Sequence, residues 1–233
     1  MFRHLALAAV LALGAVGVRA QDFEKGLAAA QSGDFQTALK EWVPLAEQGD
    51  ADAQVNLGLI YDKGEGVPQN YAEAVKWYRL AANQGNVSGQ VNLGFMYANG
   101  EGVTQDVTEA IKWFRLAANQ GNANAQTSLG VMYDEGSGVP MDDLEAVKWY
   151  RLAATQGNAN AQQNLAIMYE QGTGVPKDNV RAYMWYNIAA ANGGEESAKW
   201  REEITAKMTP EAVEKAQAMA SECLNTVYKK FGS

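Results

Sequence analysis

The sequence predicts an all-α solenoid of repeated helix-turn-helix units, and three observations lead to this prediction. Nearly the same segment begins at Gly64, Gly100 and Gly136, so the chain repeats with a period of 36 residues. Within each unit, apolar residues recur at helical spacing. The two ends of the chain depart from the pattern, as the end caps of repeat proteins do. A period of this length is typical of a fold in which each unit packs only against its neighbours.

Residues 1–20 have the pattern of a secretory signal peptide. A positively charged start precedes an apolar stretch from Leu5 to Val18, and small residues precede the expected cleavage site after Ala20. This stretch is too short for the roughly 20 residues that span a bilayer. We therefore expect a periplasmic or secreted mature chain that begins at Gln21 and has no transmembrane segment. An uncleaved membrane anchor is the alternative.

The composition of the mature chain excludes most catalytic sites. Loss of residues 1–20 removes two arginines and the only histidine, which takes the net charge from −8 to −10. No catalytic triad, imidazole base or ordinary zinc site can be built without histidine and with one cysteine. An acidic protein also lacks the basic surface that nucleic acid requires. We expect no metal, no cofactor and no nucleic-acid partner.

The chain divides into three helical parts after the signal peptide. Residues 21–36 are the expected N-terminal capping helix. Residues 37–208 are the solenoid, with about four full repeats and a divergent fifth. Residues 209–233 are the expected C-terminal capping helix, which begins with threonine at the N-cap and proline in the first turn.

The first helix of each unit, helix A, has one apolar face. In the unit after Gly64, Ala74, Trp77, Tyr78 and Ala81 follow helical spacing, and the next units repeat them. We expect the tryptophans of this series to be core residues, with an exposed binding tryptophan as the alternative. The residues expected to cap the A helices are Asp34, Asn70, Asp106, Asp142 and Asp178.

The second helix, helix B, carries a small residue that allows close packing. Gly58, Gly94 and Gly130 occupy this position, which Ala166 takes in the fourth unit. A Gly-x-Gly-Val loop follows each B helix, and its glycines supply positive φ for a compact return. A phosphate-binding loop is the alternative, but no strand precedes it.

The last helix also carries the one cysteine of the mature chain. Val213, Ala216, Ala220 and Cys223 form an apolar stripe. Cys223 is therefore expected to be a buried small apolar residue, with a reactive or dimer-forming thiol as the alternative.

These motifs together resemble the Sel1-like repeat, a relative of the tetratricopeptide repeat. The third copy carries the pattern on Ala110, Trp113, Phe114, Ala117, Gly121, Ala125, Gln126, Leu129, Gly130, Tyr133, Gly136 and Gly138. The resemblance implies a right-handed α-solenoid whose A helices line a concave surface. It also implies an adaptor or regulator of the bacterial cell envelope, and it brings no catalytic residue. Cysteine-rich members are linked to β-lactams, but the repeats of this chain contain no cysteine.

The leading functional hypothesis is a periplasmic scaffold that binds a protein or peptide partner and is not an enzyme. A protein that binds or hydrolyses muropeptides or β-lactams is one alternative, and a secreted host-interaction factor is another. No Ser-x-x-Lys motif supports a serine nucleophile. Paired carboxylates among the many acidic residues stay open.

The candidate partner-binding residues form a basic row on the face of helix A opposite its apolar face. They are Lys76, Arg79, Asn83, Lys112, Arg115, Asn119, Lys148 and Arg151. One interpretation is a solvated face whose long side chains shield the aromatic layer. The other is a groove that attracts an acidic peptide segment through arginine–carboxylate contacts.

Overall fold

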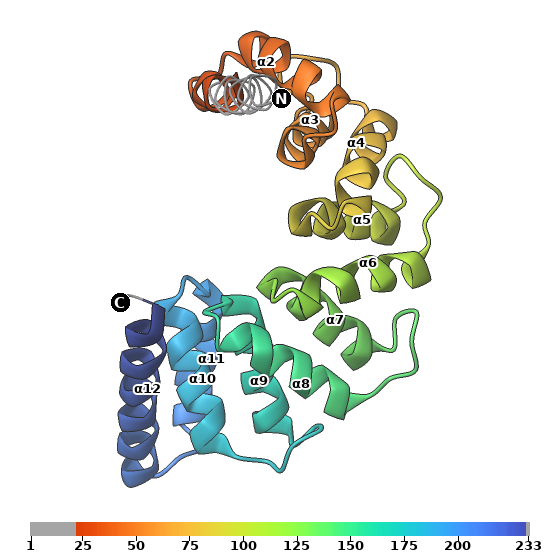
Figure 1. The fold of residues 1–233 in the computed structure, drawn as a ribbon. Helices are drawn as coiled ribbons and strands as arrows, with labels where there is room; N and C mark the ends of the chain where they lie inside the picture. The colour runs from red at the N-terminus through yellow and green to blue at the C-terminus, as the bar shows by residue number, and fades with distance from the viewer. Residues whose placement is uncertain (1–21, 232–233) are drawn as a thin grey trace, which may run out of the picture. The chain divides into compact units, whose positions relative to one another are not determined.

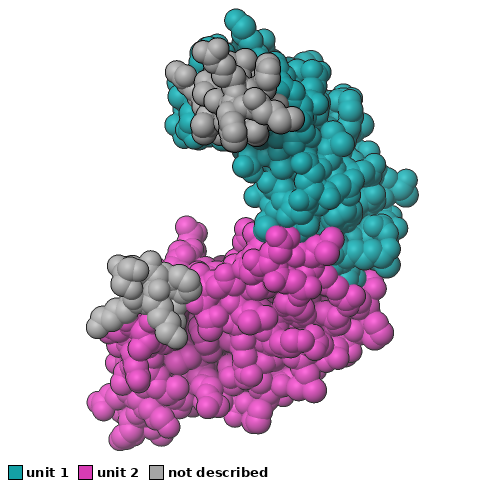
Figure 2. All heavy atoms as spheres, viewed as in Figure 1, with its two compact units in different colours: residues 1–113 teal, residues 114–233 magenta. Residues whose placement is uncertain are grey.

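The computed structural model describes residues 22–231, and the side chains as far as residue 226. Within this range the secondary structure is helical throughout, with no strand (Figure 1). The chain divides into two compact units, residues 1–113 and 114–233 (Figure 2). Each unit is described by itself. The predicted signal peptide, residues 1–20, lies outside the described residues.

Helix pairs follow one another along the chain, as the repeat predicts. Residues 22–31 are helical and precede the first pair. The A helices are α2 (Phe35–Glu47), α4 (Tyr71–Asn83), α6 (Val107–Asn119), α8 (Asp143–Ala154) and α10 (Asn179–Ala191). The B helices are α3 (Ala51–Lys63), α5 (Val87–Asn99), α7 (Ala123–Glu135), α9 (Ala159–Gln171) and α11 (Glu195–Thr205). The last helix is α12 (Pro210–Phe231).

The predicted capping residues begin the A helices. The Asp34 carboxylate accepts a hydrogen bond from the Thr37 backbone N–H at 3.1 Å, and Asp178 accepts one from Arg181 at 3.0 Å. Asn70, Asp106 and Asp142 act in the same way. These bonds satisfy backbone donors that have no partner within the helix.

Glycine sets the return loops and the distance between helices. Gly102 has a φ of 69°, and a Cβ there would lie 2.3 Å from the Tyr71 carbonyl oxygen. On helix B, a Cβ at Gly58 or Gly130 would lie 2.4 or 2.5 Å from the ring of Tyr78 or Tyr150. The predicted turn and close-packing roles are therefore both confirmed at these positions.

The core of each unit consists of the residues that repeat in register. Leu57 and Leu93 in the first unit, and Leu129 and Leu165 in the second, have no exposed surface. The aromatic rings of Tyr78, Phe114, Tyr150 and Tyr186 are also buried. Because these side chains fill the space between helices of successive pairs, removal of one ring would leave a large cavity.

The C-terminal cap begins where the sequence predicts. Thr209 Oγ1 accepts a hydrogen bond from the Ala212 backbone N–H at 3.3 Å, and α12 starts at Pro210. Ala216 and Ala220 are fully buried in the core of the second unit, and Val213 packs against that core. Among residues 22–231, no helix has the length and apolarity needed to cross a membrane.

Candidate interaction surface

Every residue of the predicted basic row is exposed on an A helix. The first unit contains Lys76, Arg79 and Asn83 on α4 and Lys112 on α6. The second contains Arg115 and Asn119 on α6 and Lys148 and Arg151 on α8. Most of these side chains contact neighbours within their own repeat: the lysines pair with carboxylates, and the arginines bond to neutral tyrosine hydroxyls.

The lysines pair with glutamates one turn earlier on the same helix. Lys148 Nζ lies 2.9 Å from Glu145 Oε1, Lys76 Nζ lies 3.3 Å from Glu73 Oε2, and Lys112 pairs with Glu109. The hydrogen bond to Glu109 raises the pKa of Lys112. Such exposed pairs contribute little to stability, but they offset the positive charge of the three lysines.

The arginines reach the B helix of their own repeat. Arg79 and Arg151 each donate a hydrogen bond of 2.8 Å to a tyrosine hydroxyl, that of Tyr97 and of Tyr169, respectively. Each guanidinium lies 5.8 Å from the centre of the same ring. Arg115 contacts Tyr133 in the same way. The sequence carried this signal as arginine and tyrosine spaced 18 residues apart in three units, but our sequence reasoning missed it.

Beneath the row lies a layer of tryptophans. The indole Nε1 atoms of Trp77, Trp113 and Trp149 are buried and have no hydrogen-bond partner. Lys76 and Lys148 lie 5.4 Å from the ring centres of Trp77 and Trp149. The long side chains therefore shield an aromatic layer from water, as the first interpretation of the row expects.

A second series on the same helices was not predicted. Leu80, Leu116 and Leu152 repeat in register, and they are 42%, 48% and 44% exposed. We call them the leucine row. The sequence indicated them as leucines that repeat every 36 residues at a position outside the helical spacing of the core residues. The exposed side of the A helices thus combines apolar and cationic groups, which is typical of surfaces that bind proteins.

The acids nearest the core have structural partners. The hydroxyls of Tyr78, Tyr150 and Tyr186 donate to Asp62, Asp134 and Glu170, at 3.2, 3.3 and 3.0 Å. Burial, followed by the nearby carboxylate, raises the pKa of these tyrosines. The copy 36 residues after Asp62 and Tyr78 has Ala98 and Phe114 at these two positions. The acid and the hydroxyl are therefore absent together in that copy.

A buried glutamine in each of the B helices α3, α5, α7 and α9 contacts neighbouring elements. Gln54 Nε2 donates to the Ala46 carbonyl at 2.9 Å, and Gln54 Oε1 accepts from Gln84 at 2.8 Å. In the second unit, Gln126 and Gln162 make the equivalent pairs of contacts. The side-chain amides of these glutamines satisfy backbone carbonyl groups at the ends of A helices. In Gln54, Gln126 and Gln162, both the amide nitrogen and the amide oxygen are hydrogen-bonded.

A surface cleft of about 440 Å³ lies between α9, α10 and α11. Its lining includes Tyr186, Trp200, Glu170 and Glu203. Both carboxylate oxygens of Glu170 are engaged, one by Tyr186 and the other by Lys207 at 2.8 Å. This leaves the cleft without two free carboxylates of the kind that glycosidases use. Within residues 22–231, no group of three histidine, cysteine, aspartate or glutamate side chains could hold a metal ion.

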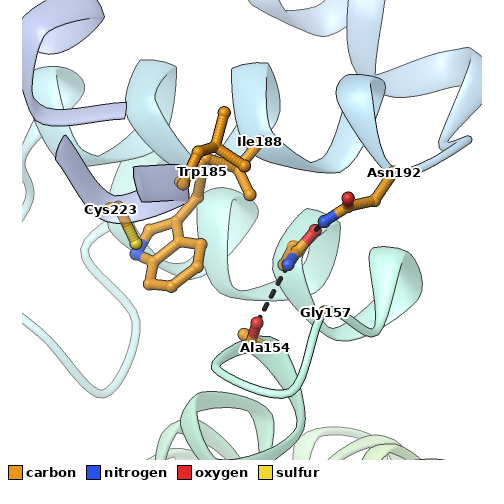
Figure 3. A pocket seen from close by; sticks show the side chains of 8 residues that line it. Ala154, Gly157, Trp185, Ile188, Asn192 and Cys223 are labelled. Atoms are coloured by element: carbon orange, nitrogen blue, oxygen red, sulfur yellow. Dashed lines mark hydrogen bonds between the residues drawn. The ribbon is translucent and has the colours of Figure 1, made fainter. Parts of the chain in front are cut away.

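Cys223 borders a small cavity under α12. The cavity, of about 10 Å³, is also lined by Trp185, Ile188 and Leu224 (Figure 3). Burial raises the pKa of the Cys223 thiol, which lowers its reactivity. This half-buried position agrees with the expected role as a small apolar packing residue.

The consecutive helix pairs and the contacts that recur in each repeat define a class of protein, the α-solenoid of helix-turn-helix repeats. The Sel1 repeat family model matches residues 51–86, 87–122, 123–158 and 159–194. The chain therefore belongs to the Sel1 repeat family. Proteins of this family are typically scaffolds for protein interactions rather than enzymes.

Solved structures of similar sequence support the assignment. A Sel1 repeat protein from Oxalobacter formigenes is 33% identical, with a TM-score of 0.76 over 88% of this chain and 82% of the other. A protective antigen of uropathogenic Escherichia coli with an SLR fold is 38% identical, with a TM-score of 0.72. That match covers 82% of this chain and 41% of the antigen. No curated protein matches the sequence.

Proposed function

We propose that the protein is an adaptor of the bacterial cell envelope that binds a protein partner on the exposed face of its A helices. The observation that carries this proposal is the leucine row, because three large apolar side chains are exposed at the same place in successive repeats. Exposed apolar groups that recur in register mark an interaction surface more strongly than scattered ones. The basic row beside them would add electrostatic attraction to an acidic segment.

The arginines are the strongest candidates for that attraction. Arg79, Arg115 and Arg151 are exposed and hydrogen-bond to neutral tyrosine hydroxyls rather than to carboxylates. Their positive charges are therefore not compensated by these contacts, whereas each lysine has a glutamate partner. A carboxylate of the partner would meet a guanidinium already positioned over a tyrosine ring.

The test begins with capture of partners from the native envelope by the mature protein. Binding of the captured partner is then compared between the natural chain and a variant with Arg79→Glu, Arg115→Glu and Arg151→Glu. We expect the variant to bind at least tenfold more weakly and to melt within a few degrees of the natural chain. Unchanged affinity and unchanged salt dependence would place the partner elsewhere, on the loops or the C-terminal cap.

Export to the periplasm is the second part of the proposal. It is supported by the charged start and apolar stretch of residues 1–20. Mass spectrometry of the protein released by osmotic shock is expected to find Gln21 at the N-terminus. An intact N-terminus in the membrane fraction would contradict cleavage and favour an anchor.

Secretion for contact with a host is a second candidate function. One observation favours it, the 38% identity to a protein described as a protective antigen of uropathogenic Escherichia coli. Detection of the protein in culture medium rather than in the osmotic-shock fraction would support this candidate.

A further inference from the structure

The second unit contains an A-helix face that is already covered by another helix. On α10, Trp185 is 8% exposed and Ile188 is 2% exposed. Ile188 has the same place in its repeat as Leu152, which is 44% exposed on α8. The difference is α12, which runs alongside α10 (Figure 1). Its Cys223 and Leu224 line a cavity together with Trp185 and Ile188 (Figure 3).

The way α12 binds defines the chemistry that such a face accepts. Ala216 and Ala220 are fully buried, so small residues allow the helix to approach the aromatic layer closely. Gln217 Nε2 adds one polar contact, a hydrogen bond of 3.2 Å to the Tyr183 hydroxyl. The other side of α12 exposes charged groups such as Glu214 and Glu222. An amphipathic helix with a stripe of small apolar residues therefore fits an A-helix face of this protein.

The neighbouring face, on α8, keeps the tryptophan and a large aliphatic residue but has Lys148 and Arg151 where α10 has Met184 and Asn187. No helix among residues 22–231 covers Leu152, which is 44% exposed. Leu152 stands where α10 has Ile188, and Trp149 stands where it has Trp185. Arg151 and Lys148 flank these residues and are exposed. The C-terminal end of α8 lies near α12, because Ala154 and Gly157 line the same cavity as Cys223 and Leu224. A helix bound over Leu152 would therefore end close to α12.

We propose that this face, defined by Trp149, Leu152 and Arg151, binds an amphipathic α-helix of the protein partner beside α12. The helix carries a stripe of small apolar residues with acidic residues along its edge. The stripe covers Leu152, and the acids meet Arg151 and Lys148. This is recognition of a helix in a groove, with a capping helix of the protein itself as the template. The inference rests on the proposed function, since it names the kind of partner segment.

The test uses a peptide of residues 210–226 with blocked ends and Cys223→Ala. The peptide carries the small-residue stripe, and its three glutamates outnumber its one lysine. Fluorescence anisotropy of the labelled peptide is measured against the full mature chain, its Leu152→Glu variant and its Met141→Glu variant. Met141 is 68% exposed in the loop before α8 and serves as the matched control. Thermal melts check that both variants fold.

We expect saturable one-to-one binding that weakens at least tenfold for Leu152→Glu and stays unchanged for Met141→Glu. The reason is that a docked helix would have to remove water from the carboxylate at position 152, while its glutamates would meet a like charge. Absence of saturable binding up to about 1 mM would overturn the proposal. Binding that Leu152→Glu leaves unchanged would also overturn it, because the peptide would then replace α12 on α10.

Two further measurements separate this inference from the broader function. If the chain dimerises and Leu152→Glu makes it monomeric, a second copy occupies the face, and the partner helix is excluded. If the triple arginine variant loses the captured partner while the peptide fails to bind, the adaptor function stands and the helix site on α8 falls. If the peptide binds as expected while the triple variant keeps its partner, the face accepts a helix, but the contact of Arg151 with acidic residues of the partner is contradicted.

Discussion

At the scale of single residues, polar side chains in this protein satisfy one another in repeated pairs. The clearest pair is a carboxylate that accepts a hydrogen bond from the hydroxyl of a buried tyrosine, as Asp134 does from Tyr150. In one repeat the two residues are Ala98 and Phe114, so the chain itself contains the double replacement. Without Asp134, the Tyr150 hydroxyl would lose the acceptor of its hydrogen bond, and without Tyr150 the Asp134 carboxylate would lose a donor.

We therefore predict a strong coupling between these two positions. Asp134→Ala is expected to lower the free energy of unfolding by about 1–3 kcal/mol, because the Tyr150 hydroxyl loses its acceptor. Adding Tyr150→Phe to that variant is expected to recover most of the loss. Urea unfolding of the natural chain, the two single variants and the double variant gives the coupling energy. Strictly additive effects would contradict the structural role of the pair.

The same pair predicts a dependence on alkaline pH. The pKa of Tyr150 is raised in the folded protein, mainly by burial, above its usual value of 10.0. As the pH rises, the unfolded chain therefore loses the phenolic proton before the folded protein does. The contribution of Tyr150 to stability is fully present below pH 10.0 and is lost as the pH rises above it. The melting temperature of the Tyr150→Phe variant is expected to fall less steeply between about pH 9 and 11 than that of the natural chain. If the melting temperatures of the two proteins fall equally with pH, burial does not raise the pKa of Tyr150, and this prediction is contradicted.

At the scale of helices, the 36-residue spacing predicted most of the structure. Caps, the close packing at Gly58 and Gly130, and the start of α12 all follow from local residue patterns, and the structure confirms them. The contacts between helices were harder to predict. The link from Arg151 to Tyr169, and the exposure of Leu152, depend on how the two helices of a pair turn toward each other. Helical spacing alone predicts the face of the helix on which a residue lies. It does not predict which residue of the other helix in the pair that residue contacts.

The buried glutamines give a prediction at this scale. Gln126 donates to the Ala118 carbonyl at 3.1 Å and accepts from Gln156 at 2.7 Å, so it joins three elements. Gln126→Leu is expected to cost about 1–3 kcal/mol, because the buried carbonyl and the Gln156 amide lose a partner. Gln171→Leu, at an exposed position of α9, is the control. A loss below about 0.5 kcal/mol for Gln126→Leu would contradict this role.

At the scale of the whole molecule, the chain places one kind of exposed face in register on successive A helices. Most core residues follow the repeat, as with Leu57, Leu93, Leu129 and Leu165, whereas the expected core residues Trp77, Trp113 and Trp149 are only partly buried. The part that the sequence analysis did not predict is the mixed character of that exposed face, because it made no prediction for Leu80, Leu116 and Leu152, which are 42%, 48% and 44% exposed. The covered face of α10, which has Met184 and Asn187 in place of the cationic residues, shows that the apolar part of an A-helix face accepts a helix.

The central claim is that the partner binds this A-helix face, and side-chain footprinting of the complex tests it most directly. Hydroxyl radicals oxidise exposed leucine and methionine, so mass spectrometry reports the exposure of Leu80, Leu116, Leu152 and Met141 with and without the captured partner. We expect the partner to reduce oxidation of leucines in the row by several-fold and to leave the loop residue Met141 unchanged. Undiminished oxidation of all three leucines in the bound protein would contradict the claim.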